Sequence, residues 1–188
     1  MLYTKRGDNG TTKTLRQKKG ERISKASCQT EALGALDELN SFLGLVKTKS
    51  RQKGLTFFKI QGRTLKEITH EVQENLFIIQ AEVAGADKII KAGKIKELEK
   101  WSGVAERAMP PIKTFFISGG TELSALFDVA RAFARRAERA VIRAVEASEI
   151  SVGKHTPAYL NRLSSLCYAL ARLANFKAGI KEQSPKYQ

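Results

Sequence analysis

Apolar residues recur at helical spacing along most of the chain and predict five amphipathic helices. Four of the stripes are long and regular, and the fifth, over 95–109, is weaker. Each apolar stripe is expected to face the other helices, with polar residues on the opposite side. The four regular stripes consist of Ala32, Leu36, Leu39, Leu43 and Val46; Leu65, Ile68, Val72, Leu76, Ile79 and Val83; Leu123, Leu126, Phe127, Ala130, Ala134, Ala137, Val141, Ala144 and Val145; and Leu160, Leu163, Cys167, Leu170 and Ala174.

The ends of these helices carry their own signals. Gly85 is placed to end the second helix, because glycine readily adopts the left-handed conformation that follows many helices. Pro110 and Pro111 end the third, since proline cannot continue a helix. Thr121 is a good N-cap for the fourth helix, and Pro157 opens the fifth at a position that favours proline.

Outside the helices the sequence predicts little regular structure. The one strand signal is the apolar run Thr-Phe-Phe-Ile at 114–117. Residues 46–54 read as a helix end followed by an exposed connection, and the tail from 177 onward as basic, polar and frayed. Long helices joined by short turns are typical of an all-α bundle. The polar side of the first helix is formed by Asp37, Asn40, Ser41 and Gly44.

The composition favours one globular domain with a polyanionic partner. The chain has 188 residues, enough for a single core, and its formal net charge is +14. That charge leaves DNA, a nucleotide and a merely solvated basic surface open. No apolar run approaches the roughly 20 residues of a membrane span, and the N-terminus does not read as a signal peptide. Cys28 and Cys167 lie far apart, which favours a reducing cytoplasm over a disulfide scaffold.

The N-terminal stretch 3–13 is a first candidate for phosphate binding. Gly7 and Gly10 let backbone N–H groups turn toward a ligand, and the neighbouring threonines and lysines could donate to phosphate oxygens. The stretch lacks the Gly-Lys-Ser/Thr of a P-loop. An ordinary turn is the alternative, because Asp-Asn-Gly at 8–10 is strong turn chemistry.

The arginine-rich stretch 131–139 is the second candidate. Arg131, Arg135 and Glu138 line one side of the predicted helix, and Asp128 could pair with Arg131. Guanidinium groups bind phosphates in a bidentate, directional way, so we interpret this helix as an anion-binding face. An ion-pair face on the surface or at a subunit interface is the alternative.

The remaining polar clusters are less specific. Asn161, Ser165, Tyr168 and Arg172 share one side of the last helix, for which an exposed face is the favoured interpretation. Asp37 and Asn40 form another cluster on the first helix. A carboxylate inside a bundle would need a cation, which the arginine helix could supply.

The standard motifs of nucleophilic and metal catalysis are missing from the sequence. His70 and His155 are isolated from each other and from any ligand spacing, so no metal ligand is predicted. No Gly-x-Ser-x-Gly, HExxH or Rossmann fingerprint occurs. An enzyme with this sequence would therefore depend on positioning and electrostatics.

Five segments, in order and spanning almost the whole chain, resemble the PduO-type ATP:cob(I)alamin adenosyltransferases, also called corrinoid adenosyltransferases. Each segment alone is weak, but five in register are highly specific. The matching residues are 3–12; Gly34, Asp37, Glu38, Leu39, Asn40 and Ser41; Phe115, Gly119 and Gly120; 135–139; and 159–164.

The resemblance implies a ferritin-like five-helix bundle that assembles into a homotrimer with active sites between subunits. It divides the single domain 1–188 into an ATP-binding loop over 1–28, a helical bundle over 29–180 and a tail over 181–188. The implied reaction transfers the 5′-deoxyadenosyl group of ATP to cob(I)alamin and yields adenosylcobalamin and triphosphate. Because Co(I) is itself a powerful nucleophile, the protein would need none of its own. Mg²⁺ on the ATP phosphates is also implied, without a protein ligand.

The resemblance also implies roles for individual residues. The expected catalytic residues are Arg131, Arg135 and Asp37, with Arg131 pairing across the interface with Asp37 of the partner subunit to shape the cobalamin site. Phe115 is expected to displace the lower axial ligand of cobalt, which makes Co(II) easier to reduce. The expected ATP contacts are Thr4, Lys5, Arg6, Gly7, Asp8, Gly10, Thr11, Thr12, Lys13, Lys25, Arg135, Arg136, Glu138, Arg139 and Asn161.

The chain departs from the family pattern at a few positions. Ala26 and Ser27 stand where the family often has two aspartates, and Arg6, Ser118 and Ser165 replace a threonine, a proline and an aspartate. These changes bear on metal coordination and efficiency and leave the arginines intact. A non-catalytic ATP- or corrinoid-binding paralogue is one alternative, and a basic nucleic-acid-binding module is another. A corrinoid reductase or a cobalamin-dependent acceptor enzyme is an implied partner.

Overall fold

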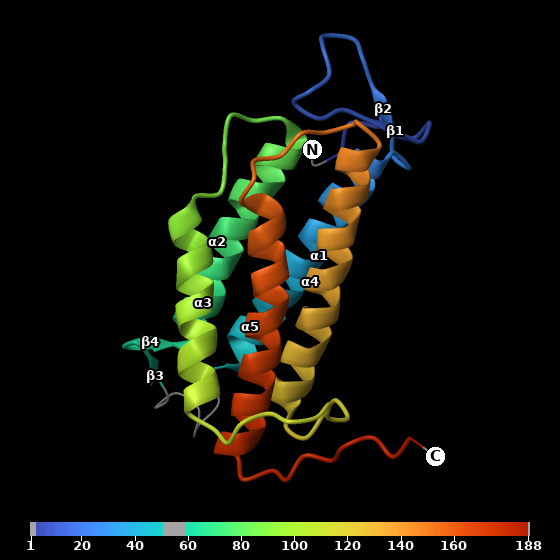
Figure 1. Ribbon diagram of the computed structural model, residues 1–188. Helices are drawn as coiled ribbons and strands as arrows, with labels where there is room; N and C mark the ends of the chain where they lie inside the picture. Colours follow the sequence, from blue (N-terminus) through green and yellow to red (C-terminus); the bar gives the residue numbers. More distant parts are fainter. Residues whose placement is uncertain (1–2, 51–58, 188) are drawn as a thin grey trace.

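Five helices run side by side along one bundle, as Figure 1 shows. The computed structural model describes residues 3–50 and 59–187. The all-α bundle predicted from periodicity is thereby confirmed, with each helix close to its expected position. The helices are α1 (Cys28–Lys49), α2 (Leu65–Ala84), α3 (Ala92–Arg107), α4 (Glu122–Glu146) and α5 (Thr156–Lys177).

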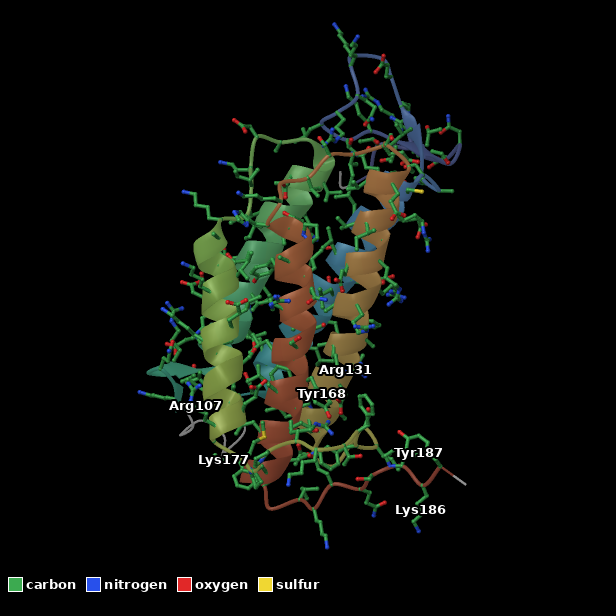
Figure 2. All side chains as sticks on the ribbon, viewed as in Figure 1. Arg107, Arg131, Tyr168, Lys177, Lys186 and Tyr187 are labelled. Atoms are coloured by element: carbon green, nitrogen blue, oxygen red, sulfur yellow. The ribbon has the colours of Figure 1, made fainter. Side chains whose placement is uncertain are left out.

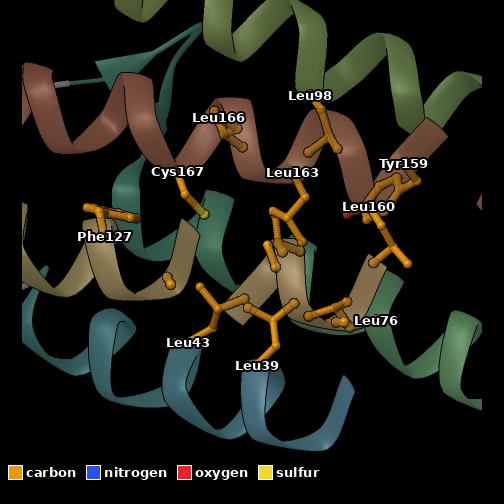
Figure 3. Packing of buried hydrophobic residues seen from close by; sticks show 14 of the residues in the cluster. Leu39, Leu43, Leu76, Leu98, Phe127, Tyr159, Leu160, Leu163, Leu166 and Cys167 are labelled. Atoms are coloured by element: carbon orange, nitrogen blue, oxygen red, sulfur yellow. The ribbon is translucent and has the colours of Figure 1, made fainter. Parts of the chain in front are cut away.

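The predicted apolar stripes form the core between the helices (Figure 3). Four of the nine buried residues of α4 are alanine, and α4 packs against both α1 and α5 through this stripe. Small side chains let the helix axes approach closely, so little of this face remains open to solvent. The stripe is narrower than predicted, because Leu126 is only half-buried and Val145 is 39% exposed.

The helix ends follow the sequence signals. Thr121 caps α4 by accepting a hydrogen bond from the backbone N–H of Ser124. Gly85 follows α2 with a φ of 101°, the left-handed conformation that favours glycine. Proline occupies the first turn of α5. Each predicted boundary is therefore explained by local backbone chemistry.

The strand prediction was wrong. Residues 114–117 form no strand, and Phe115 and Ile117 are exposed. Two short antiparallel pairings occur elsewhere and are too brief to show a period-two pattern. They join β1 (Thr11–Thr12) to β2 (Ile23–Ser24) and β3 (Lys59–Ile60) to β4 (Arg63–Thr64).

Three further expectations need correction. Asn40 is buried, 4% exposed, instead of lying on the polar side of α1. Helix α1 continues past Val46 to Lys49, and part of the connection predicted over 46–54 lies outside the described residues. The segment after α5 is not frayed, because the backbone N–H of Ile117 donates to the carbonyl oxygen of Gln183, 2.8 Å away. No helix in the described ranges is both long and apolar enough to span a bilayer.

Glu82 joins the end of α2 to the connection between α4 and α5. Its carboxylate is 5% exposed. It accepts hydrogen bonds from the backbone N–H of Gly153 and from the hydroxyl of Thr156, both at 2.5 Å. The free energy of unfolding falls when a buried carboxylate and its donors lose their hydrogen bonds, because no water is there to replace them. This contact therefore fixes the turn that leads into α5.

We expect Glu82→Ala to lower the free energy of unfolding by about 3 kcal/mol, because the buried hydroxyl of Thr156 and the half-buried N–H of Gly153 lose a charged acceptor. Chemical denaturation monitored by circular dichroism measures the change. The matched control is Glu74→Ala on the same helix, whose side chain is 66% exposed and should cost less than about 0.5 kcal/mol. Equal effects of the two substitutions would show that the Glu82 contact is not stabilising.

Candidate functional site

The arginines of α4 are divided between two sides of the helix, one toward α1 and one toward α5. Arg136, Arg139 and Arg143 lie on the side of α1. Arg131 and Arg135 lie on the side of α5. Each group lines its own cavity, so the arginine stretch is not one continuous site within the chain.

The first of these, the arginine cavity, lies between α1 and α4 and has a volume of 470 Å³. Arg136 forms an ion pair with Glu38 and lies over the ring of Phe133, 4.9 Å from its centroid. Three guanidinium groups against two carboxylates leave the cavity net positive, which suits a polyanion. Its lining consists of Thr30, Glu31, Gly34, Ala35, Glu38, Arg136, Arg139, Ala140 and Arg143.

The N-terminal loop lies at the end of the bundle where α1 begins and α4 ends (Figure 1). Its backbone does form the Asp-Asn-Gly turn that was the alternative to a phosphate site, because the N–H of Gly10 donates to the carbonyl of Gly7 at 3.2 Å. The predicted ATP contact Lys25 belongs to the same unit: its N–H donates to the carbonyl of Gly10 at 2.9 Å. A side chain at position 7 would meet the Lys25 ammonium group at 3.1 Å, so glycine leaves room for that charge.

Two arginines near these residues were missed by the sequence analysis. Arg22 donates through Nε to the hydroxyl of Thr11 at 2.7 Å and through Nη2 to its carbonyl at 2.8 Å, and so holds the loop closed. Arg143 adds a third guanidinium to the arginine cavity. The position of Arg143, four residues after Arg139, was a usable signal. The Arg22 contact depends on the pairing of β1 with β2, which no local sequence pattern predicts.

The second, the aromatic cavity, lies between α4, α5 and the phenylalanine loop, residues 112–120, and has a volume of 650 Å³. Phe115, 74% exposed, stands at this cavity with Arg131 and Arg135. Figure 2 shows Arg131 and Tyr168 on neighbouring helices at this level of the bundle. Burial raises the pKa of Tyr168. The lining consists of Glu106, Phe115, Phe116, Ser118, Asp128, Arg131, Arg135, Ser164, Ser165 and Tyr168.

Asp37 is not part of this lining and is exposed on α1. The predicted partner of Arg131 within the chain, Asp128, is confirmed at 3.9 Å from its Nε. Asp128 has a closer partner, because Nη2 of Arg172 lies 2.5 Å from its other carboxylate oxygen. Arg172 is 1% exposed, so its expected place on an exposed face of α5 was wrong. The pairing of Arg131 with Asp37 of the partner subunit stays a prediction.

The predicted ATP contacts are divided between the two sides of α4. Arg136 and Arg139 line the arginine cavity, whereas Arg135 lines the aromatic cavity. Asn161 donates to Glu138 at 3.1 Å across the seam between α4 and α5. Within one chain, therefore, no described cavity collects all of them.

Two side chains with nucleophilic atoms, the Cys167 thiol and the Tyr159 hydroxyl, are buried in the core. Burial raises the pKa of the Cys167 thiol to about 12 and raises the pKa of the Tyr159 hydroxyl as well. Neither group is ionised at neutral pH, and neither lines the arginine cavity or the aromatic cavity. In the ranges 3–50 and 59–187, no three His, Cys, Asp or Glu side chains come together as a metal site would require.

Comparison with known proteins identifies the group to which the chain is similar. A family model described as cobalamin adenosyltransferase matches residues 2–174. The corrinoid adenosyltransferase of Bacillus subtilis is 33% identical over 180 residues, which cover 95% of this chain and 89% of that protein. The corrinoid adenosyltransferase PduO of Citrobacter freundii is 37% identical over 185 residues, 94% of this chain, and the match spans 50% of its length.

A solved structure extends the similarity to the whole fold. It is a variant PduO-type ATP:corrinoid adenosyltransferase from Lactobacillus reuteri in complex with cobalamin and ATP. The TM-score is 0.84 at 26% sequence identity, and the match covers 100% of this chain and 97% of that one.

We expect the two thiols to differ sharply in reactivity. At pH 8 a thiol with a pKa of about 12 is ionised in only about one molecule in ten thousand, and Cys167 is also 2% exposed. A disulfide reagent should therefore modify Cys28 in the native protein and both cysteines after unfolding. Cys28→Ser provides the control and should leave no thiol that reacts within minutes. Rapid native modification of Cys167 in that variant would contradict the buried position.

Proposed function

The chain belongs to the cobalamin adenosyltransferase family, and we propose that it transfers the 5′-deoxyadenosyl group of ATP to cob(I)alamin. The electron pair of Co(I) attacks C5′, the C5′–O bond breaks, and triphosphate leaves with the bonding electrons. A cobalt–carbon bond forms, giving adenosylcobalamin. The observation that carries this proposal is the pair of cavities on α4, one lined by guanidinium groups and one that combines arginines with aromatic rings.

The triphosphate of ATP is proposed to bind at the arginine cavity and the N-terminal loop. Guanidinium groups neutralise the leaving triphosphate, which lowers the barrier because its charge grows as the bond breaks. The turned backbone around Gly7 and the Lys25 ammonium group are further donors at this end of the bundle. The complete proposed set is Thr4, Lys5, Arg6, Gly7, Asp8, Gly10, Thr11, Thr12, Lys13, Lys25, Arg135, Arg136, Glu138, Arg139 and Asn161.

The corrin ring is proposed to dock at the aromatic cavity. Phe115 offers an exposed apolar ring that would press on the lower face of the corrin and displace the axial ligand, which eases reduction to Co(I). Arg131 and Arg135 would orient the reactants from α4, with Arg131 held by Asp37 of the partner subunit. Ser118 and Ser165, where the chain departs from the family, line this cavity with hydroxyl groups and leave both arginines in place.

A homotrimer with active sites between subunits is proposed to complete the arrangement. Because the predicted ATP contacts face two sides of α4, a second subunit would be needed to bring both sides to one ligand. Apolar side chains on the outer surfaces of α1 and α4 support such an interface: Leu45, Val129 and Ile142 are 44%, 41% and 36% exposed. The whole chain, 1–188, would act as one domain in the cytoplasm, supplied with reduced corrinoid by a reductase.

Mg²⁺ is proposed to accompany ATP on its phosphate oxygens. The ion prefers oxygen ligands and keeps several waters, and Glu31 and Glu38 place two carboxylates in the arginine cavity. Because Glu38 is already paired with Arg136, the ion would be held mainly by phosphate oxygens and water, and it would neutralise part of the triphosphate charge. Ala26 and Ser27 supply no carboxylate before α1.

The reaction is tested by mixing the protein with Mg-ATP and chemically reduced cobalamin. We expect adenosylcobalamin, seen by its absorption spectrum, together with triphosphate. Arg135→Ala should lower kcat/KM by about a hundredfold, because one donor to the developing charge is lost. Arg107→Ala, an exposed arginine on α3 outside both cavities, is the matched control. Failure of the folded protein to form product, or DNA binding that ATP does not compete, would contradict the proposal.

The position of the site between subunits is tested by mixing two inactive variants. Asp37→Ala and Arg131→Ala should each be inactive alone. Mixed trimers should recover about one quarter of the wild-type rate, because random assembly places intact partners at that share of the interfaces. Absence of recovery in mixed oligomers verified by mass spectrometry would place the two residues in the same chain's site.

A further inference from the structure

The segment after α5, residues 178–187, crosses the end of the bundle beside the phenylalanine loop (Figure 1), and we call it the C-terminal strap. The Ile117 N–H donates to the Gln183 carbonyl at 2.8 Å. A 270 Å³ cavity between the two segments is lined from both, with Ser118 and Gly119 on one side and Lys181 and Glu182 on the other. Strap and loop are therefore packed along each other.

One side chain of the strap reaches the interior. The carboxylate of Glu182, 13% exposed, lies 2.7 Å from Nη1 of Arg172 and accepts a hydrogen bond from the side-chain amide of Asn175 at 2.6 Å. Arg172 and Asn175 are 1% and 0% exposed. A cation at that depth needs a charged partner, so the strap supplies part of the neutralisation of Arg172.

From Asn175 the contacts lead to the phenylalanine loop. Its amide nitrogen donates to the carbonyl of Gly119 at 2.7 Å, and its amide oxygen accepts from the N–H of Thr121 at 2.9 Å. A Cβ atom at position 120 would lie 2.5 Å from that amide oxygen, so only glycine leaves room for the Asn175 side chain. Glu182 thus orients the amide that fixes the end of the loop carrying Phe115.

From Arg172 a second set of contacts leads to Arg131. Arg172 pairs with Asp128 at 2.5 Å, and the other oxygen of Asp128 lies 3.9 Å from Nε of Arg131. The Arg172 guanidinium also lies 5.1 Å from the ring of Tyr168, which lines the aromatic cavity. Glu182 neutralises part of the charge of Arg172. The Asp128 carboxylate is therefore not fully neutralised by Arg172 and can also attract Arg131.

We propose that Glu182 is a positioning residue for the corrinoid, because its carboxylate fixes both the phenylalanine loop and the orientation of Arg131 in the aromatic cavity. The assignment to the corrinoid rests on the function proposed above. The arginine cavity lies on the other side of α4 and shares no residue with this set of contacts. Loss of Glu182 is therefore expected to weaken corrinoid binding and to leave ATP binding unchanged.

The structural half of the proposal is tested without any ligand, by amide hydrogen exchange. In Glu182→Ala the N–H groups of Ile117 and Thr121 should exchange about tenfold faster than in the wild type, while those inside α4 stay unchanged. Gln183→Ala is the matched control, since Gln183 contributes its backbone carbonyl to the Ile117 bond. Wild-type exchange in Glu182→Ala would overturn the proposal whether or not the protein is an adenosyltransferase.

The functional half compares two ligands on the same variants. Glu182→Ala should bind cob(II)alamin about tenfold more weakly and show a raised KM for corrinoid, with the Kd for ATP within twofold of the wild type. Glu182→Gln, which keeps an acceptor for Asn175 and removes the charge, should fall in between. Unchanged corrinoid binding, or equal weakening of both ligands, would overturn the positioning role. A wild type that binds no corrinoid would refute the proposed function, and the exchange result would still decide the strap's contact.

Discussion

Helix α4 packs against both α1 and α5 through a stripe of small side chains, and the rest of the site depends on this contact. Ala130, Ala134 and Ala137 are 0% exposed, so the helix is held on both sides with little clearance. Residues just outside the stripe have to emerge on one flank or the other. Their long cationic side chains therefore line separate cavities, and the helix itself becomes the wall between them.

This division explains how a helix rich in one residue type can serve two chemical tasks. On the α1 flank the guanidinium groups face threonine, glycine and carboxylates, an environment for a hydrated polyanion. On the α5 flank they face aromatic rings, where a flat apolar ligand with polar edges is better accommodated. The Cys167 thiol and the Tyr159 hydroxyl, both potential nucleophiles, are buried in the core. The protein's contribution is thus confined to shape and charge.

The sequence was sufficient for the helices because their signals are local. Periodicity locates a stripe, and a single residue such as Thr121 or Gly85 fixes an end. It was insufficient wherever a residue's partner is distant in the chain. Arg172 reads as a surface residue until Asp128 and Glu182 are known to face it, 44 positions before and ten after. Likewise, resemblance gathered the candidate site residues, but the distribution of the arginines over two flanks needed the neighbours of α4. Contacts that require a second subunit stay predictions.

The exposure of Phe115 has a thermodynamic consequence. With 74% of its surface in water, the ring orders solvent that a ligand's apolar face would release. A ligand that covers the ring would gain about 2 kcal/mol of binding free energy, and the heat-capacity change of binding would be negative. Binding enthalpy would then become more favourable as temperature rises, and a small anion, which cannot cover the ring, would lack this dependence. Calorimetry at several temperatures would thus distinguish an apolar ligand from a small anion by the slope of binding enthalpy against temperature.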